Sequence, residues 1–235
     1  MHVPPTVTKP LNLTQAELSN RVQQIVTQRM AGQQAGHGMD HVHRVLANAQ
    51  QIQAEVGGDR FIVELACLLH DVGDAKFNDG MERSAQFARE ILEEVGVQPA
   101  AIQHIADIVD NISFRKGVDP RTLTLEGQIV QDADRLDALG AIGIVRTIEY
   151  GAACDQPFFL SGSPDQIASS RTGIGHFFQK LFRLRELLNT EVARRLAAER
   201  ERFMRDFVAQ YLSEVGLSQS DTSVLLTRGQ RDERQ

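Results

Sequence analysis

The sequence lacks the features that mark several protein classes. It holds only two cysteines, Cys67 and Cys154, in 235 residues, and two such residues do not make a disulfide framework. No stretch approaches the roughly 20 apolar residues that cross a membrane. The first residues have neither the basic start nor the apolar run of a signal peptide. We therefore expect a cytoplasmic protein that makes no membrane contact.

Positive charge is also in the minority. The chain has 25 Lys and Arg against 31 Asp and Glu, which gives a formal net charge of −6. Long nucleic acid is not an expected partner, because phosphate contacts need clustered basic residues. A local basic pocket for one small phosphate ester stays compatible with this balance. The 42% hydrophobic and 24% charged residues are typical of a folded chain with a sizeable core.

Patterns typical of β-strands are nearly absent, whereas apolar residues recur at helical spacing along most of the chain. Helix starts are indicated by Thr14 with Glu17 as a capping box, by Asp59 as a cap and by Pro99 in a first turn. The spacing predicts helices over residues 14–30, 39–56, 59–70, 81–95, 99–112, 126–149 and 173–215, with a break near 189–190 left open. We expect an all-α chain with a flexible arm (1–11), one helical domain (12–216; core about 20–150, extension 172–216) and a polar tail (217–235).

Three of the predicted helices carry an ionisable residue on their apolar side: His41, His70 and Asp134. A buried charge needs a partner or a metal, and imidazoles with carboxylates suit a divalent transition metal. Neighbours such as His70 and Asp71 do not point at one spot unless something bridges them. Periodicity does not choose between Asp132 and Asp134. The competing interpretation treats these groups as buried polar cross-links and predicts no metal.

The order of these residues resembles the H…HD…D signature of the HD-domain phosphohydrolases. The matching runs are Gly38-Met39-Asp40-His41-Val42-His43-Arg44-Val45, then His70-Asp71, then Asp132-Ala133-Asp134-Arg135-Leu136. The resemblance implies an all-α HD-domain helical bundle, here with a C-terminal helical extension. It also implies that one divalent metal ion (Mn, Co, Ni, Mg, Fe or Zn) is bound by His41, His70, Asp71 and Asp134.

Further runs are similar to a bacterial branch of small HD proteins, some of which hydrolyse nucleotides: Ala75-Lys76-Phe77, Asn111-Ile112-Ser113-Phe114, Leu139-Gly140-Ala141-Ile142-Gly143 and His176-Phe177-Phe178-Gln179-Lys180-Leu181. This likeness implies a metal-dependent phosphohydrolase of a small phosphorylated substrate, a nucleotide above all, of the nucleoside triphosphate pyrophosphohydrolase or nucleotidase type. The alternative is a non-catalytic sensor of the same fold that binds metal and nucleotide. Many HD phosphodiesterases carry extra histidines for a second metal, but here the interval between Asp71 and Asp134 offers only His104, which favours one ion. The oligomeric state is left open.

Residues beside the motif are candidates for the chemistry. Asp74 could orient or deprotonate the attacking water, and Lys76 could hold the phosphate. Arg44 contacts the substrate or else pairs with Asp71 or Asp137. Further candidates for substrate binding are a histidine in a glycine-flanked loop and two residues that share one helix face four positions apart: His37, His176 and Lys180.

Overall fold

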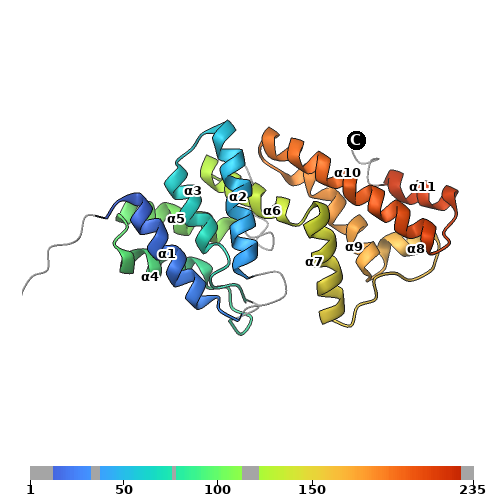
Figure 1. Cartoon of the computed structure of the whole chain (residues 1–235), viewed down its shortest axis with the longest axis horizontal. Helices are drawn as coiled ribbons and strands as arrows, with labels where there is room; N and C mark the ends of the chain where they lie inside the picture. The colour runs from blue at the N-terminus through green and yellow to red at the C-terminus, as the bar shows by residue number, and fades with distance from the viewer. Residues whose placement is uncertain (1–12, 33–37, 76–77, 113–121, 229–235) are drawn as a thin grey trace, which may run out of the picture.

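Helices make up all the regular secondary structure of the residues that the computed structural model describes, which are 13–32, 38–75, 78–112 and 122–228 (Figure 1). The expectation of an all-α protein is confirmed, while the predicted arm, 1–11, lies outside the described residues. In chain order the helices are α1 (Gln15–Arg29), α2 (Met39–Val56), α3 (Arg60–Leu69), α4 (Ser84–Val95), α5 (Pro99–Asn111), α6 (Leu125–Asp137), α7 (Gly140–Ala153), α8 (Pro164–Ser169), α9 (Gly173–Gln179), the 3-10 turns η4 (Leu181–Arg183) and η5 (Arg185–Leu187), α10 (Glu191–Glu214) and α11 (Gln219–Arg228).

The helix starts follow the capping signals of the sequence. The hydroxyl of Thr14 accepts a hydrogen bond from the backbone N–H of Glu17 (3.3 Å), and the carboxylate of Glu17 accepts one from the backbone N–H of Thr14 (2.8 Å). Asp59 caps α3 by accepting from the N–H of Phe61 (2.9 Å), and Pro99 is the first residue of α5. These contacts satisfy donors that the first turn of a helix leaves without partners.

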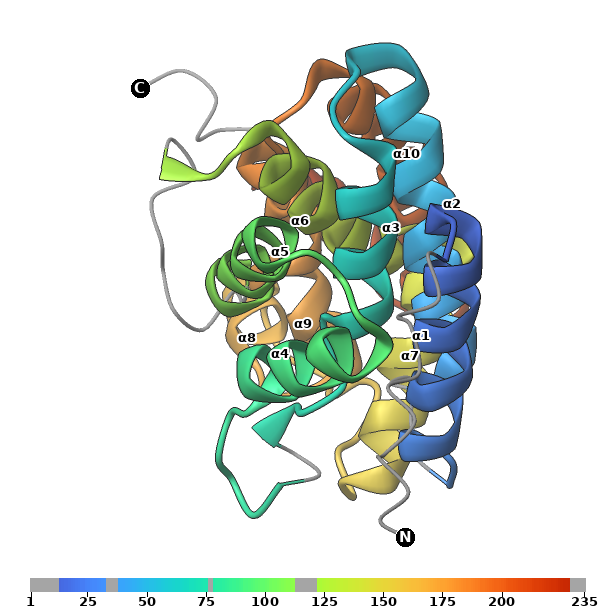
Figure 2. The same ribbon diagram turned by 90° about the vertical axis from the view of Figure 1, so that its left-hand side faces the viewer.

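The helices form an N-terminal group, α1 to α5, and a C-terminal group, α7 to α11, with α6 between them (Figure 1). Within the N-terminal group, α3 runs through the middle and packs on α1, α2, α4, α5 and α6 (Figure 2). Helix α6 packs on α2, α3 and α5 and also on α7 and α10. Because α6 has neighbours on most sides, its buried residues include charged ones as well as apolar ones. The ends of α3 and α6 therefore lie where ionisable groups can be partly or fully buried.

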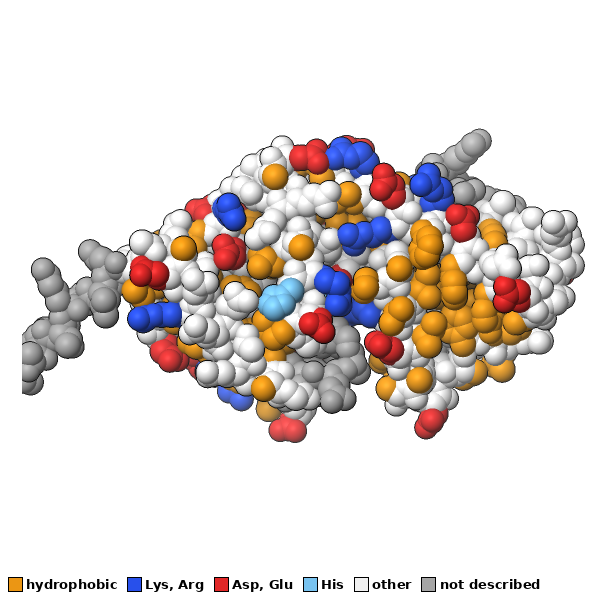
Figure 3. Space-filling model, viewed as in Figure 1, with side chains coloured by type: hydrophobic (Ala, Val, Ile, Leu, Met, Phe, Trp, Pro, Cys, Tyr) orange, Lys and Arg blue, Asp and Glu red, His pale blue; other side chains and the backbone are white. Residues whose placement is uncertain are grey.

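The helix predicted over residues 126–149 is in fact two helices, α6 and α7, with a turn at 138–139. Gly140 has a left-handed φ of +77°, and a Cβ atom on Gly143 would lie 2.2 Å from the carbonyl oxygen of Ala138. Both positions thus require glycine. The apolar spacing continues through this turn, which is why periodicity alone did not reveal it. Apolar side chains of α7 are exposed, among them Ile142 and Val145, and exposed apolar side chains gather on the C-terminal group (Figure 3).

We expect Gly143→Ala to destabilise the protein by about 1–3 kcal/mol, because the added methyl group meets backbone that cannot give way. Gly127→Ala is the matched control: it lies inside α6, and its Cβ would meet its nearest neighbours at 3.5 Å, an ordinary contact distance. That control should be neutral or slightly stabilising. Urea denaturation of both variants measures the difference. Equal stability of the two variants would show that the turn tolerates a side chain.

The C-terminal part differs from the prediction in three places. The region predicted as one helix from 173 to 215 contains α9, two 3-10 turns and α10, and the break near 189–190 is confirmed because Thr190 caps α10. Between the helices predicted over 126–149 and 173–215, where no helix was predicted, residues 164–169 form α8. Residues 219–228, expected within a polar tail, form α11, since Leu225 is buried and Arg205 donates to the carbonyl of Leu226 (2.9 Å). Among the described helices, none has the length and hydropathy of a membrane span.

Candidate metal centre

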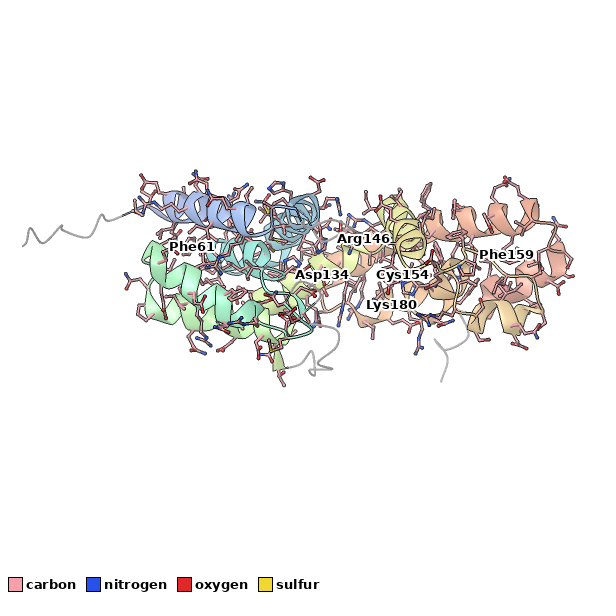
Figure 4. The ribbon with its side chains drawn as sticks, turned by 90° about the horizontal axis from the view of Figure 1, so that it is seen from below. Phe61, Asp134, Arg146, Cys154, Phe159 and Lys180 are labelled. Atoms are coloured by element: carbon pink, nitrogen blue, oxygen red, sulfur yellow. The ribbon has the colours of Figure 1, made fainter. Side chains whose placement is uncertain are left out.

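Ends of three helices bring the four predicted ligands together. His41 lies in the first turn of α2, His70 is the C-cap of α3 and Asp71 follows it, while Asp134 lies in the last turn of α6. Both histidines are buried, Asp71 is half-buried, and the side chain of Asp134 is 42% exposed. Asp134 lies near the middle of the molecule, where the two groups of helices meet (Figure 4). The cluster thus has a buried side made of imidazoles and an accessible side made of carboxylates.

The spacing of the side-chain atoms fits one small ion. The Nε2 atom of His41 lies 3.1 Å from the Nε2 of His70, and both lie 3.5 Å from Oδ2 of Asp71. The Oδ1 atom of Asp134 is 3.5 Å from the same Nε2 of His41. Ligands about 2.0–2.2 Å from an ion such as zinc lie about 3–3.6 Å apart at right-angle to tetrahedral bond angles. Among the residues that the structure describes, His41, His70 and Asp71 form the one group of three or more histidine, cysteine or acidic side chains whose ligand atoms all lie within 4.8 Å of one another.

The hydrogen bond at Nδ1 of each imidazole determines whether Nε2, which faces the cluster, has a lone pair for a metal. The Nδ1 atom of His70 lies 2.8 Å from the carbonyl oxygen of Cys67, and the Nδ1 of His41 lies 2.7 Å from Oδ2 of Asp137. Both partners are acceptors, so we infer a hydrogen on each Nδ1, and each ring presents its Nε2 lone pair to the cluster when it is neutral. Lone pairs and carboxylates that face one another repel unless a cation, either a metal ion or the proton of a charged imidazole, lies among them. The group therefore has the donor set of a divalent metal site.

Asp132 is engaged elsewhere, although it lies only two residues before Asp134. It is fully buried, and its carboxylate accepts four hydrogen bonds: from the backbone N–H groups of Asn189 and Thr190 (2.7 and 2.8 Å), the Thr190 hydroxyl (2.8 Å) and the Asn189 amide (2.9 Å). These contacts join α6 to the start of α10. The geometry therefore separates two carboxylates that periodicity did not, with Asp134 at the cluster and Asp132 at a joint between helices.

Known proteins are similar to this chain in sequence and in fold. The HD-domain family matches residues 38–139, a segment that holds all four clustered residues. YpgQ of Bacillus subtilis is 36% identical over 214 residues, which cover 90% of this chain and 98% of YpgQ. This chain belongs to the HD-domain family. The crystal structure of YpgQ in complex with ADP superposes on this HD-domain protein with a TM-score of 0.73 at 31% identity, covering 87% of this chain and 98% of YpgQ. An HD-superfamily hydrolase from Bacillus thuringiensis gives a TM-score of 0.71 at 34% identity, covering 87% of this chain and all of that one.

Other residues predicted for the HD-domain site lie at different places. Asp74 is half-buried in the turn after Asp71, whose carbonyl accepts from its backbone N–H (3.2 Å). His104 belongs to α5, and its Nε2 atom lies 3.0 Å from the hydroxyl of Thr124 at the N-terminal end of α6. It is thus remote from the cluster, which lies at the C-terminal end of α6. His37 and Lys76 lie outside the described residues. His176 of α9 is half-buried, and Lys180, which follows the last residue of α9, is exposed. Burial and the charge of Lys180 lower the pKa of His176.

Arg44 pairs with an acidic neighbour, one of its two predicted roles. Its Nε donates to Oδ1 of Asp137 (2.6 Å) and its Nη2 to Oδ2 (3.0 Å). Arg146 of α7 also donates to Asp137, and its Nη1 lies 3.0 Å from Nδ1 of His41. Arg146 was not foreseen, because only the turn between α6 and α7 brings it here. Asp137 was foreseen only as a partner of Arg44; its position three residues after Asp134, on the same side of the helix, was the signal for a larger role.

The metal-free HD domain should lose stability as the pH rises. Burial would lower the pKa of His41, but hydrogen bonds with Asp137 and Asp71 outweigh it and raise this pKa to about 9. A group whose pKa is raised by folding stabilises the protein fully below its unfolded pKa of about 6.5, and that stabilisation is lost as the pH passes 9. The expected loss is about 3 kcal/mol between pH 6 and pH 10.

Urea denaturation in the presence of chelator measures this loss. Asp137 shifts in the opposite direction: burial would raise its pKa, but hydrogen bonds from His41 and Arg44 hold it well below its usual range. Its contribution is therefore present above about pH 4 and is lost only in stronger acid. The His41→Asn variant is the control, and its stability should fall less between pH 6 and pH 10. Parallel curves of stability against pH for the wild type and His41→Asn would contradict the assigned pair of His41 and Asp137.

Proposed function

We propose that this protein is a metal-dependent phosphohydrolase that acts on a small phosphate ester, and that its substrate is a nucleotide. The observation that carries the proposal is the convergence of the Nε2 atoms of His41 and His70 and one oxygen of Asp71 at spacings of 3.1–3.5 Å, with an oxygen of Asp134 3.5 Å from His41. Membership in a family that includes HD-superfamily hydrolases supports it. The competing view of these residues as buried cross-links is disfavoured, because the side chains of Asp71 and Asp134 keep 18% and 42% of their surface exposed.

The proposed roles of the four ligands differ with the burial of their side chains. His41 and His70 form the buried wall of the site, and Asp71 and Asp134 form its accessible edge. One divalent ion bound there would acidify a water molecule and polarise a phosphoryl oxygen. Asp74, three residues after Asp71, is proposed to orient that water or take its proton. We propose one ion rather than two, because His104 of α5 lies beside the N-terminal end of α6, away from the cluster. Among Mn, Co, Ni, Mg, Fe and Zn, two imidazole ligands favour a transition metal over Mg.

A nucleotide as substrate is supported from two directions. YpgQ, which matches nearly the whole chain, was crystallised with ADP. In addition, Arg44 and Arg146 keep 33% and 22% of their side chains exposed beside the cluster. Lys180 is the C-cap of α9, which packs on α7, the helix that carries Arg146. We propose that these cations, together with His37, Lys76 and His176, hold the phosphate chain of a nucleoside triphosphate or a nucleoside monophosphate.

A screen with defined products tests the proposal. Protein purified without chelator is loaded in turn with Mn²⁺, Co²⁺, Ni²⁺ or Mg²⁺ and offered nucleoside triphosphates, diphosphates, monophosphates and a simple aryl phosphate. Ion-exchange chromatography then separates the products. Release of pyrophosphate with a monophosphate identifies a pyrophosphohydrolase, whereas release of inorganic phosphate identifies a nucleotidase. Saturable binding of a nucleotide that no metal causes to be consumed would overturn the proposal in favour of a sensor.

A further inference from the structure

We propose that Asp137 is a positioning residue of the metal centre, which fixes the tautomer and the orientation of His41. The inference rests on the metal site of the proposed function. Asp137 is 2% exposed, and its Oδ2 atom lies 2.7 Å from Nδ1 of His41. An ionised carboxylate only accepts hydrogen bonds, so it keeps the hydrogen on Nδ1 and leaves the lone pair on Nε2. That lone pair faces His70, Asp71 and Asp134.

Two arginines hold this carboxylate from different helices. Arg44 lies one turn after His41 on α2 and binds both oxygens of Asp137, at 2.6 and 3.0 Å. Arg146 reaches Oδ2 from α7, and its Nη1 also lies 3.0 Å from Nδ1 of His41; we assign the guanidinium hydrogen to the carboxylate, which is the shorter of the two contacts. Two guanidinium groups against one buried carboxylate keep it ionised, and a paired guanidinium fixes its plane. Asp137 therefore has a defined orientation before any ligand binds, and it transmits that orientation to the His41 ring.

The turn between α6 and α7 makes the arrangement possible. Arg146 follows Asp137 by nine residues, and in one continuous helix the two would stand about 13 Å apart along the axis. The turn, with its glycines at 140 and 143, brings α7 back so that the two side chains meet. His70 needs no carboxylate to orient its ring, because its Nδ1 donates to the backbone carbonyl of Cys67. Asp137 is thus the side chain through which a substitution can alter the orientation of a ligating histidine without removing a ligand.

The test compares the metal affinity of the full-length protein with that of its Asp137→Asn variant, by competition for Co²⁺ or Zn²⁺ with a chromophoric chelator. We expect Asp137→Asn to bind one ion about 10–100-fold more weakly, the usual effect of removing such a partner. Asp134→Asn is the matched control, with the same substitution one turn earlier on the same helix, and should lose stoichiometric binding. An Asp137→Asn affinity within twofold of the wild type would overturn the proposal.

A second measurement does not depend on the variant folding. Long-range ¹⁵N–¹H NMR of the zinc-loaded wild type, with His41 assigned through a His41→Gln variant, should show a hydrogen on Nδ1 and the metal on Nε2. Metal on Nδ1, or no metal bound at all, would overturn the proposal. Both measurements are independent of turnover, so a protein that binds zinc as expected but hydrolyses nothing would count against the proposed function and leave the role of Asp137 in place.

Discussion

The Asp71→Ala variant is expected to purify without metal and to lose at least about 10³-fold of the hydrolytic rate, while its fold survives. Asp71 provides the oxygen that lies 3.5 Å from both histidine nitrogens, so its removal opens the centre of the ligand set. A bound ion supplies several kcal/mol of transition-state stabilisation, and each 1.4 kcal/mol or so is tenfold in rate. The side chain is only half-buried and follows the end of α3, so few packing contacts are lost.

Elemental analysis, turnover and thermal melting of the same samples check this expectation. Asp206→Ala is the control, since Asp206 is an exposed carboxylate on α10, and it should keep both metal and activity. In chelator, Asp71→Ala should melt only slightly below the wild type, because the variant loses the hydrogen bond between Asp71 and His41. With metal present the wild type alone should gain stability, because only it binds the ion in the folded state. Stoichiometric metal in Asp71→Ala would remove Asp71 from the ligand set, and unfolding in chelator would assign it a structural role.

The ligand cluster could be predicted because the residue types and their order along the chain indicate a metal site. His41, His70 and Asp134 lie on otherwise apolar helix sides and require an explanation. Asp71 follows His70 directly and adds a second carboxylate. Their convergence is what the structure shows. The supporting residues could not be found in the same way. Arg146 meets His41 and Asp137 only because the chain turns after α6, and this turn interrupts an apolar pattern that runs on as if the helix were continuous.

Helix α6 shows why periodicity could not choose between its acidic residues. Amphipathic reasoning assumes one buried side and one exposed side, but α6 packs on helices of both groups. Asp132 and Asp137 are buried on different sides, and Asp134, the carboxylate at the cluster, is the most exposed of the three. For a helix with neighbours on most sides, burial does not indicate which acidic residue binds a metal and which one holds a neighbouring helix. The hydrogen-bond partners of each side chain indicate this.

The Asp132→Ala variant is expected to lose about 3–5 kcal/mol of unfolding free energy without losing the metal site. Removing this fully buried carboxylate leaves four donors of Asn189 and Thr190 without their acceptor. A buried donor left unpaired costs about 1–3 kcal/mol, and broken buried networks account for many of the largest single-substitution effects. The damage should appear where α10 begins, because Thr190 caps that helix.

Asp134→Ala is the matched comparison, two residues away on the same helix. Its side chain is 42% exposed, so its loss should change stability by no more than about 0.5 kcal/mol in chelator, yet abolish metal binding. Urea denaturation and metal content per folded molecule, measured on both variants, should therefore give opposite results. If Asp132→Ala lost the ion and kept its stability, the ligand would be Asp132 and the cluster would have to rearrange around it. The opposite pattern would show that one buried helix uses one carboxylate to hold α10 and another to bind metal.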